Sequence, residues 1–209
     1  MFKNRFDAAE QLVPLLEQYK SKPDTIVIAI PRGGLELGNI LAKKLHLPLD
    51  VIFSKKIGLP TNPEFAIGAV SDKHIFVNER FKDIPELRNY IAEQAKSIRS
   101  IIKKRNTTYR RDMPPLDLSN KTAIIVDDGV ATGNTLLATI ALIREYKPKK
   151  IVVALPVCPA DTFEKIKQQA DQVVCVTIPA IFYSVGQFYL NFNQVDDQEA
   201  IRLLHEANL

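Results

Sequence analysis

The sequence predicts an α/β fold: a parallel, twisted sheet flanked by helices. Short apolar runs rich in β-branched residues alternate with segments of helical length from residue 7 to residue 177. The strand-like runs are apolar throughout, which is typical of parallel strands that helices cover on both faces. No repeat, low-complexity segment or composition shift divides the 209 residues, so we expect one domain over residues 1–209.

Composition is that of a globular protein, with 46% hydrophobic and 25% charged residues. A chain of this length buries roughly 70% of its unfolded surface, so it requires no disulfide or structural metal. Cys158 and Cys175 are too few for a zinc motif or a disulfide scaffold. Residues 1–20 lack the apolar segment of a signal peptide, and no apolar run approaches the ~20 residues of a membrane span. We expect a soluble, cytoplasmic protein without a membrane partner.

The first half of the chain predicts a helix, two strands and a loop. Asp7 and Glu10 are spaced as a capping box, which predicts a helix over residues 7–19, and Pro14 is expected to kink it or to shift its start. Glycines and prolines predict a loop over residues 54–68. The remaining elements expected here are a strand over 25–30, a helix over 33–45, a strand over 49–53, and a hairpin of 69–71 with 75–77.

A long helix is expected to begin at Asp83, with Pro85 in its first turn. Between Arg80 and Arg111 ten lysines and arginines face three acidic residues, a local charge of +7, whereas the whole chain has a net charge of +4. This basic element indicates an anionic partner, although a solvated helix face is an equally good interpretation.

The second half of the chain continues the alternation of strands and helices. Apolar runs predict strands, and amphipathic segments between them predict helices. The expected elements are a strand over 122–126, a helix over 134–146, a strand over 150–156, a helix over 161–169 and a strand over 172–177.

Asp127 and Asp128 follow the apolar run 122–126, and a turn of small residues then leads into a helix. In a parallel sheet, ligands bind beyond the carboxyl ends of the strands. The backbone N–H groups of residues 131–135, at a helix N-terminus, suit a phosphate group. Two carboxylates would repel a bare anion, so they should face sugar hydroxyls or a metal ion. A ribose 5-phosphate has both features.

Other phosphate-binding motifs do not match. Gly129 and Gly133 are too close for a P-loop, and Asn134 stands where its lysine would be. The dinucleotide fingerprint GxGxxG is also absent. The remaining alternative is that Asp-Asp-Gly serves only as a turn.

The segment VDDGVATGNT resembles the signature of the type I phosphoribosyltransferases. The resemblance implies that family's fold, a parallel sheet with a small variable hood. It also implies that the loop binds the 5-phosphate of phosphoribosyl pyrophosphate and that Asp127 and Asp128 hold the ribose 2- and 3-hydroxyls. The loop residues matched are Ala131, Thr132, Gly133, Asn134 and Thr135.

Two further segments are similar to pyrophosphate-binding parts of the family. One is Pro31-Arg32-Gly33-Gly34, for which the resemblance implies a cis peptide bond next to Arg32. The other is Lys55-Lys56, of which at least one should face pyrophosphate. Expected catalytic residues are therefore Asp127, Asp128, Arg32 and Lys55, and expected substrate-binding residues include Gly33, Gly34 and Lys56. The resemblance implies Mg²⁺ as cofactor, held indirectly by Asp127 and Asp128.

The resemblance also bears on the acceptor, a nitrogenous compound. Members that act on 6-oxopurines carry an aspartate at the position of Ala131, so a 6-oxopurine acceptor is disfavoured. We expect residues 54–80 to form a mobile region and residues 179–209 to form the hood. Five aromatic residues within 182–192 would stack on a planar base or, alternatively, form a small aromatic core.

Two other functions remain open. The first is a regulator that senses phosphoribosyl pyrophosphate and binds RNA or DNA through residues 80–111. No segment of the sequence is left over, however, to form a separate domain that reads nucleic acid. Nucleic acid is therefore disfavoured as a partner. The other alternative is an enzyme of a different class that acts on ribose 5-phosphate. The interpretation allows for a homodimer.

Overall fold

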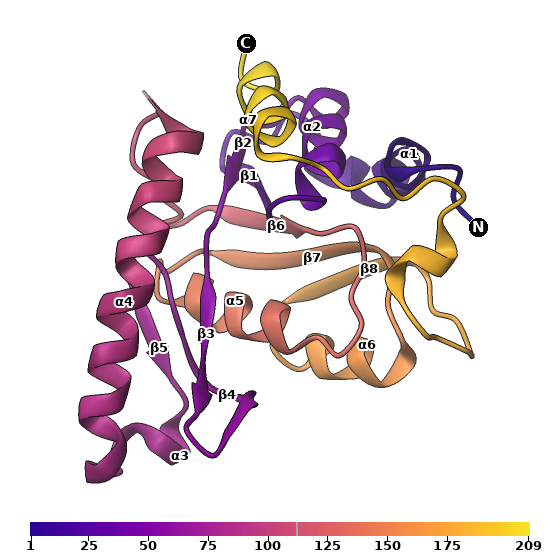
Figure 1. Ribbon diagram of the computed structural model, residues 1–209. Coiled ribbons are helices and arrows are strands. Elements are labelled where there is room, and N and C mark those ends of the chain that lie inside the picture. Colours follow the sequence, from indigo (N-terminus) through magenta and orange to yellow (C-terminus); the bar gives the residue numbers. More distant parts are fainter. Residues whose placement is uncertain (112) are drawn as a thin grey trace. The chain divides into compact units, whose positions relative to one another are not determined.

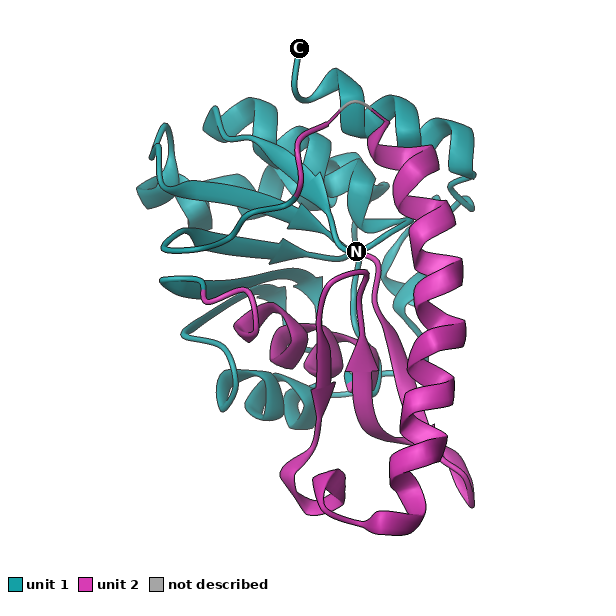
Figure 2. Cartoon of the chain, turned by 90° about the vertical axis from the view of Figure 1, so that its left-hand side faces the viewer, with its two compact units in different colours: residues 1–52, 116–133, 148–209 teal, residues 53–115, 134–147 magenta. Residues whose placement is uncertain are grey.

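A computed structural model describes residues 1–111 and 113–209, apart from the side chain of Glu64. The chain forms two compact units, coloured separately in Figure 2. Unit 1 consists of residues 1–52, 116–133 and 148–209, and unit 2 consists of residues 53–115 and 134–147.

The centre of unit 1 is a five-stranded sheet in which every neighbouring pair of strands is parallel. Its order is β2-β1-β6-β7-β8 (Figure 1). The strands are β1 (Thr25–Ala29), β2 (Leu49–Val51), β6 (Thr122–Val126), β7 (Lys150–Val157) and β8 (Gln172–Thr177). All five residues of the central strand β6 are buried, as its unbroken apolar run predicts. The predicted fold class is confirmed.

Helices cover both faces of the sheet in unit 1. Its helices are α1 (Arg5–Leu16), α2 (Gly34–Leu45), α6 (Ala160–Lys167) and α7 (Asp197–Glu206), with short 3₁₀ turns at Glu17–Tyr19 and Val185–Phe188. Figure 1 shows α1 and α2 on one face and α6 on the other. Helix α7 packs against α2, so the C-terminal segment returns to the N-terminal half of the unit.

Helix α1 begins at Arg5, two residues before the predicted start at Asp7. Its N-cap is Asn4, whose side chain accepts a hydrogen bond from the backbone N–H of Asp7 at 3.0 Å. The predicted capping box of Asp7 and Glu10 is therefore wrong, because Asp7 lies within the first turn. Pro14 lies inside the helix, which continues to Leu16.

Unit 2 is built on a three-stranded antiparallel sheet, β3-β4-β5. Its elements are β3 (Lys55–Leu59), β4 (Asn62–Val70), β5 (Ile75–Val77), α3 (Glu79–Lys82), α4 (Pro85–Arg110) and α5 (Asn134–Arg144). Both α4 and α5 pack against this sheet. The predicted pairing of residues 69–71 with 75–77 is confirmed by the β4–β5 ladder.

The loop predicted over residues 54–68 is wrong, because these residues form the β3–β4 hairpin. A Cβ atom on Gly58 would overlap the carbonyl oxygen of Pro63 and lie 2.7 Å from its Cα, so glycine allows the two strands to approach here. The pairing also shifts register between Ile57 and Leu59. The glycines and prolines that predicted a loop therefore mark an irregular hairpin.

The long basic helix predicted from Asp83 is α4, whose N-cap is Ile84. Ala95, Ile98 and Ile102 are buried at helical spacing and form the inner face of this helix. Tyr109, near its end, packs edge-on against Phe53 with 4.9 Å between the ring centres. Within the described residues, no helix combines the length and apolarity that crossing a membrane requires.

Candidate functional site

The site is centred on the carboxyl end of β6, where Asp127 and Asp128 follow the last strand residue. Strand β1 lies beside β6 with Ala29 opposite Val126, and the backbone N–H of Ile30 donates to the carbonyl of Val126 at 3.0 Å. Because the two strands are parallel and paired to their last residues, their carboxyl ends lie side by side at one edge of the sheet. The segment after β1, residues 31–34, therefore lies next to the two aspartates, as the sequence predicts.

The loop after β1 has the cis peptide bond that the resemblance implies, between Pro31 and Arg32. Gly33 and Gly34 then pack directly on the two aspartates. A Cβ atom on Gly33 would overlap Oδ2 of Asp128, and one on Gly34 would lie 2.7 Å from the carbonyl oxygen of Val126. Both glycines are thus required by the close contact between the loops that follow β1 and β6.

Arg5, which the sequence analysis did not single out, is the main partner of Asp128. Its Nε donates to Oδ2 of Asp128 at 2.8 Å, and its Nη1 donates to the carbonyl of Asn193 at 2.7 Å. The Arg5 side chain is 6% exposed, and its guanidinium lies 4.0 Å from the centre of the Phe192 ring. Its position one turn before Ala8 signals that Arg5 lies on the buried face of α1, but it does not identify Asp128 as the partner.

Tyr189 holds Asp128 from another side. Its hydroxyl donates to the backbone carbonyl of Asp128 at 2.6 Å, and its ring stacks on Phe192 with 4.8 Å between centres. Phe2 packs against the same tyrosine at 5.3 Å. Tyr189 and Phe192 therefore form a small aromatic cluster, as the alternative interpretation of residues 182–192 predicts. Tyr183, by contrast, is 85% exposed.

Burial and mutual repulsion disfavour the charged forms of the two aspartates. Burial raises the pKa of Asp127 well above its usual range, and the neighbouring Asp128 raises it further. Burial also raises the pKa of Asp128, while the Arg5 guanidinium acts in the opposite direction. Hydroxyl donors or a cation placed before this pair would stabilise its charge.

The turn after the aspartates is anchored on its inner side and exposed on its outer side. Gly129 and Gly133 have positive φ angles of 148° and 76°. The carbonyl of Ala131 accepts a hydrogen bond from the hydroxyl of Thr162 at 2.8 Å. The turn leads directly into α5 at Asn134, as predicted. Its exposed residues, whose N–H groups belong to a helix N-terminus, are Ala131, Thr132, Asn134 and Thr135.

A cleft of about 310 Å³ lies beside Asp128 in unit 1. Arg5 and Gly33, which both contact Asp128, form part of its wall, and Arg32 contributes a second guanidinium. Nη1 of Arg32 lies 3.7 Å from Oδ1 of Asp197, the first residue of α7. The other lining residues are Phe192, Asn193, Gln194 and Val195. The cleft thus joins the loop after β1 to the C-terminal segment.

Lys55 and Lys56 are the first residues of β3 in unit 2 and pair with Val70 and Ala69 of β4. The Lys55 side chain is exposed and Lys56 is partly exposed. Next to them, the hydroxyls of Ser54 and Thr139 are hydrogen-bonded at 2.7 Å, which ties the start of β3 to α5. Their expected contact with pyrophosphate stays a prediction.

A magnesium ion would depend on the aspartate pair and on its ligand. The described residues contain no group of three or more His, Cys, Asp or Glu side chains arranged to hold a metal. Asp127 and Asp128 nevertheless suit Mg²⁺, which is commonly held by one or two carboxylates together with the phosphates of a substrate.

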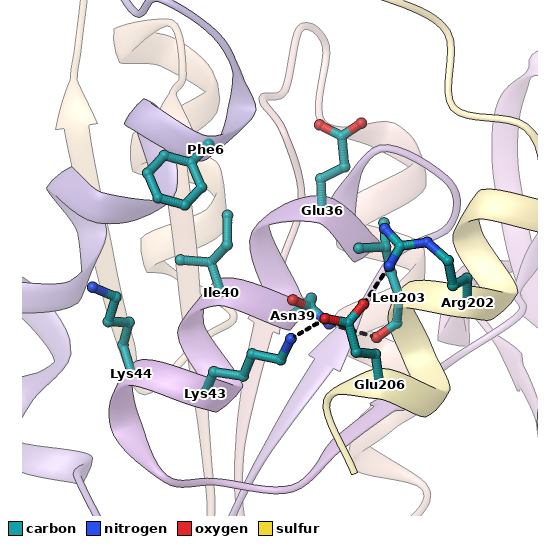
Figure 3. A pocket seen from close by; sticks show the side chains of 9 residues that line it. All are labelled: Phe6, Glu36, Asn39, Ile40, Lys43, Lys44, Arg202, Leu203 and Glu206. Atoms are coloured by element: carbon teal, nitrogen blue, oxygen red, sulfur yellow. Dashed lines mark hydrogen bonds and ion pairs between the residues drawn. The ribbon is translucent and has the colours of Figure 1, made fainter. Parts of the chain in front are cut away.

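A second hollow, of about 360 Å³, lies between α1, α2 and α7 (Figure 3). Ion pairs line one side, where Glu206 contacts both Lys43 and Arg202 (Figure 3). Beside them, the Asn39 amide donates to the carbonyl of Leu203 at 2.7 Å. These contacts fasten α7 to α2.

Comparison with known proteins agrees with the resemblance. A family model described as "Phosphoribosyl transferase domain" matches residues 5–193. Two relatives from Mycobacterium tuberculosis strains, named "Putative phosphoribosyl transferase MT0597" (CDC 1551) and "Putative phosphoribosyl transferase Rv0571c" (H37Rv), are each 35% identical over 212 residues. The match covers 100% of this chain and 47% of each relative, so the chain spans about half their length.

A solved structure is similar over the full length. The crystal structure of TT1426 from Thermus thermophilus is 33% identical, with a TM-score of 0.86, and the match covers 98% of each chain. The residues that the family model matches include the aspartate pair, the loop after β1 and Arg5.

Proposed function

The chain belongs to the phosphoribosyl transferase domain family, and on that premise we propose that it transfers a phosphoribosyl group from phosphoribosyl pyrophosphate to a nitrogen atom of an acceptor. The observation that carries the proposal is the aspartate pair at the end of β6, followed directly by an anchored turn and the N-terminus of α5. This order along the chain offers carboxylates for a diol and N–H groups for a phosphate, the two features of a ribose 5-phosphate.

In this proposal, each half of the site holds one part of the sugar phosphate. Asp127 and Asp128 accept hydrogen bonds from the ribose 2- and 3-hydroxyls. The backbone N–H groups of residues 131–135 bind the 5-phosphate, and the Thr132 and Thr135 hydroxyls add donors. The exposure of the turn and its anchoring through Thr162 support this assignment, because a rigid N–H array loses little entropy when it binds an anion.

The reaction breaks the bond between C1 of the ribose and a pyrophosphate oxygen and forms a bond between C1 and the acceptor nitrogen. Positive charge develops on the sugar while negative charge develops on the leaving group. Arg32, Lys55 and Lys56 are the cations that we propose stabilise pyrophosphate. The Arg32 guanidinium lines the cleft beside Asp128, which supports its part in this role.

Magnesium fits the same site. When bound, Mg²⁺ would neutralise charge on the pyrophosphate and so favour its departure. Asp127 and Asp128 would hold the ion indirectly, through the ribose hydroxyls that they bind. The raised pKa of both aspartates is consistent with a pair whose charge a cation would stabilise.

We propose a nitrogenous acceptor other than a 6-oxopurine. Ala131 presents a methyl group where members of the family that act on 6-oxopurines have a carboxylate, and its carbonyl is already bonded to Thr162. Of the C-terminal residues that we expect to form the hood, Phe192 to Val195 line the cleft beside Asp128, and Tyr189 donates to the carbonyl of Asp128.

The alternative is a regulator that senses phosphoribosyl pyrophosphate and binds RNA or DNA. The observation that favours it is a hollow of about 590 Å³ along α4, lined by Lys103 and Lys104 together with Ser100, Thr107 and Thr108. Cations and hydroxyls on one helix face suit a phosphate backbone.

The test is to supply phosphoribosyl pyrophosphate and Mg²⁺ with a panel of purines, pyrimidines and amines, and to measure both pyrophosphate and the ribosylated product. We expect pyrophosphate release that requires one class of acceptor and that vanishes in the Asp127→Asn, Asp128→Asn double variant. Release at the same rate without any acceptor would contradict transfer and would indicate hydrolysis. The absence of release, together with tight binding of the donor, would favour the regulator.

A further inference from the structure

Arg5 joins three parts of unit 1 that are far apart in the sequence. From α1, its guanidinium reaches the carboxylate of Asp128 at 2.8 Å, the carbonyl of Asn193 at 2.7 Å and the face of the Phe192 ring at 4.0 Å. Glu36 is the other acidic group near it, 3.9 Å from Nη1. A buried guanidinium with such partners holds them in a fixed geometry, because its donors form a rigid planar fork.

These contacts leave Asp128 little freedom. Its Oδ2 is bonded to Arg5 and abuts the Cα of Gly33, where even one methyl group would overlap it. Its backbone carbonyl accepts a hydrogen bond from Tyr189. The other carboxylate oxygen, Oδ1, therefore has a set direction, and the guanidinium offsets part of the charge of the aspartate pair.

We propose that Arg5 is a positioning residue for ribose binding. It fixes Asp128 so that one carboxylate oxygen is held by the protein and the other meets a ribose hydroxyl, and it keeps Phe192 and Asn193 aligned with the aspartates. The inference rests on the proposed function, in which Asp128 binds the ribose. Arg5 acts through Asp128 and does not itself contact the sugar.

The experiment measures the binding of ribose 5-phosphate and, separately, of pyrophosphate to the full chain with Mg²⁺, by calorimetry. Arg5→Met removes the guanidinium but keeps an unbranched side chain. We expect ribose 5-phosphate to bind about tenfold more weakly, as for the loss of one hydrogen bond to a charged group, while pyrophosphate affinity stays unchanged. Equal weakening for both ligands would overturn the proposal, because it would make Arg5 a general anion-binding residue.

The matched control is Arg202→Met. Arg202 lies on α7, is 58% exposed and pairs with Glu199 and Glu206, so the same substitution there removes ion pairs without touching Asp128. It should leave the affinities for both ligands as in the wild type.

A double-variant cycle separates positioning from a general loss of structure. If Arg5 acts through Asp128, then Arg5→Met should have no further effect on ribose 5-phosphate affinity in an Asp128→Asn background. The same tenfold loss in both backgrounds would overturn the inference. Unchanged ribose 5-phosphate binding by Asp128→Asn alone would instead refute the proposed function, which distinguishes the two failures.

Arg5→Lys covers the case in which Arg5→Met does not fold. Lysine keeps a positive charge at the site, but its ammonium cannot hold Asp128 and Asn193 in one planar fork. We expect a folded variant whose ribose 5-phosphate affinity falls and whose pyrophosphate affinity does not. Wild-type affinity for ribose 5-phosphate in this variant would contradict the proposal.

Discussion

A Cβ atom on Gly33 would overlap Oδ2 of Asp128 and lie 2.7 Å from its Cγ. The backbone at Gly33 has a φ of −58°, which any residue can adopt, so the demand for glycine comes from this contact alone. The loop after β1 thus sets the orientation of the second aspartate, and a side chain at residue 33 would displace the carboxylate.

Gly33→Ala should weaken ribose 5-phosphate binding about tenfold or more, because the new methyl group forces Asp128 out of its position. Calorimetry on the folded variant measures this. Wild-type affinity in the Gly33 variant would show that the orientation of Asp128 is unimportant for binding.

Asp127→Asn should increase stability at alkaline pH. The pKa of Asp127 is raised in the folded state, so its ionisation opposes folding as the pH rises above the unfolded value of about 3.9. Without ligand and with a chelator present, the variant should have a free energy of unfolding on the order of 1 kcal/mol above that of the wild type at pH 8.

That difference in unfolding free energy should nearly vanish near pH 3, well below the unfolded pKa, where the wild-type carboxyl is protonated in both states. Denaturant unfolding at pH 3 and pH 8 measures it. A gap of equal size at pH 3 and pH 8 would mean that the effect of the substitution is unrelated to the ionisation of Asp127.

Tyr189→Phe should lower the free energy of unfolding by about 1 kcal/mol, since the carbonyl of Asp128 loses its hydroxyl donor. Burial raises the pKa of this hydroxyl, so it stays protonated and able to donate at neutral pH. Tyr183→Phe, at a residue that is 85% exposed, should be neutral. Equal unfolding free energies for Tyr189→Phe and the wild type would remove Tyr189 from the network around Asp128.

The strands that carry the site were predictable, because an unbroken apolar run leaves few alternatives. The bounds of β6 and β8 agree with the prediction, and so does the start of α5 at Asn134. The β3–β4 hairpin was not predictable from the sequence, since glycine and proline residues such as Gly58 and its neighbours occur both in loops and in irregular hairpins.

The residues around the aspartates were predictable only in part. Arg32 and the two glycines follow a strand, and their place could be inferred from the rule that strand ends form the site. Arg5 and Tyr189 lie 123 and 61 positions from Asp128 along the chain. Contacts of this kind depend on how α1 and the C-terminal segment pack, which no local pattern encodes.

The basic helix α4 gives a prediction that separates the two candidate functions. If the chain is a transferase, Lys103→Gln with Lys104→Gln should leave pyrophosphate release unchanged, and a short RNA or DNA probe should show no affinity that falls steeply with salt. Fluorescence anisotropy at several salt concentrations measures the affinity for the nucleic-acid probe. Tight, strongly salt-dependent binding that the double variant loses would favour the regulator.

The most direct test of the proposed function is a calorimetric titration with phosphoribosyl pyrophosphate, with and without Mg²⁺, on the wild type and on the Asp127→Asn, Asp128→Asn double variant. We expect binding in the micromolar range, about −8 kcal/mol, that requires Mg²⁺ and is lost in the double variant. Absence of binding to the wild type under both conditions, or equal binding by the double variant, would contradict it.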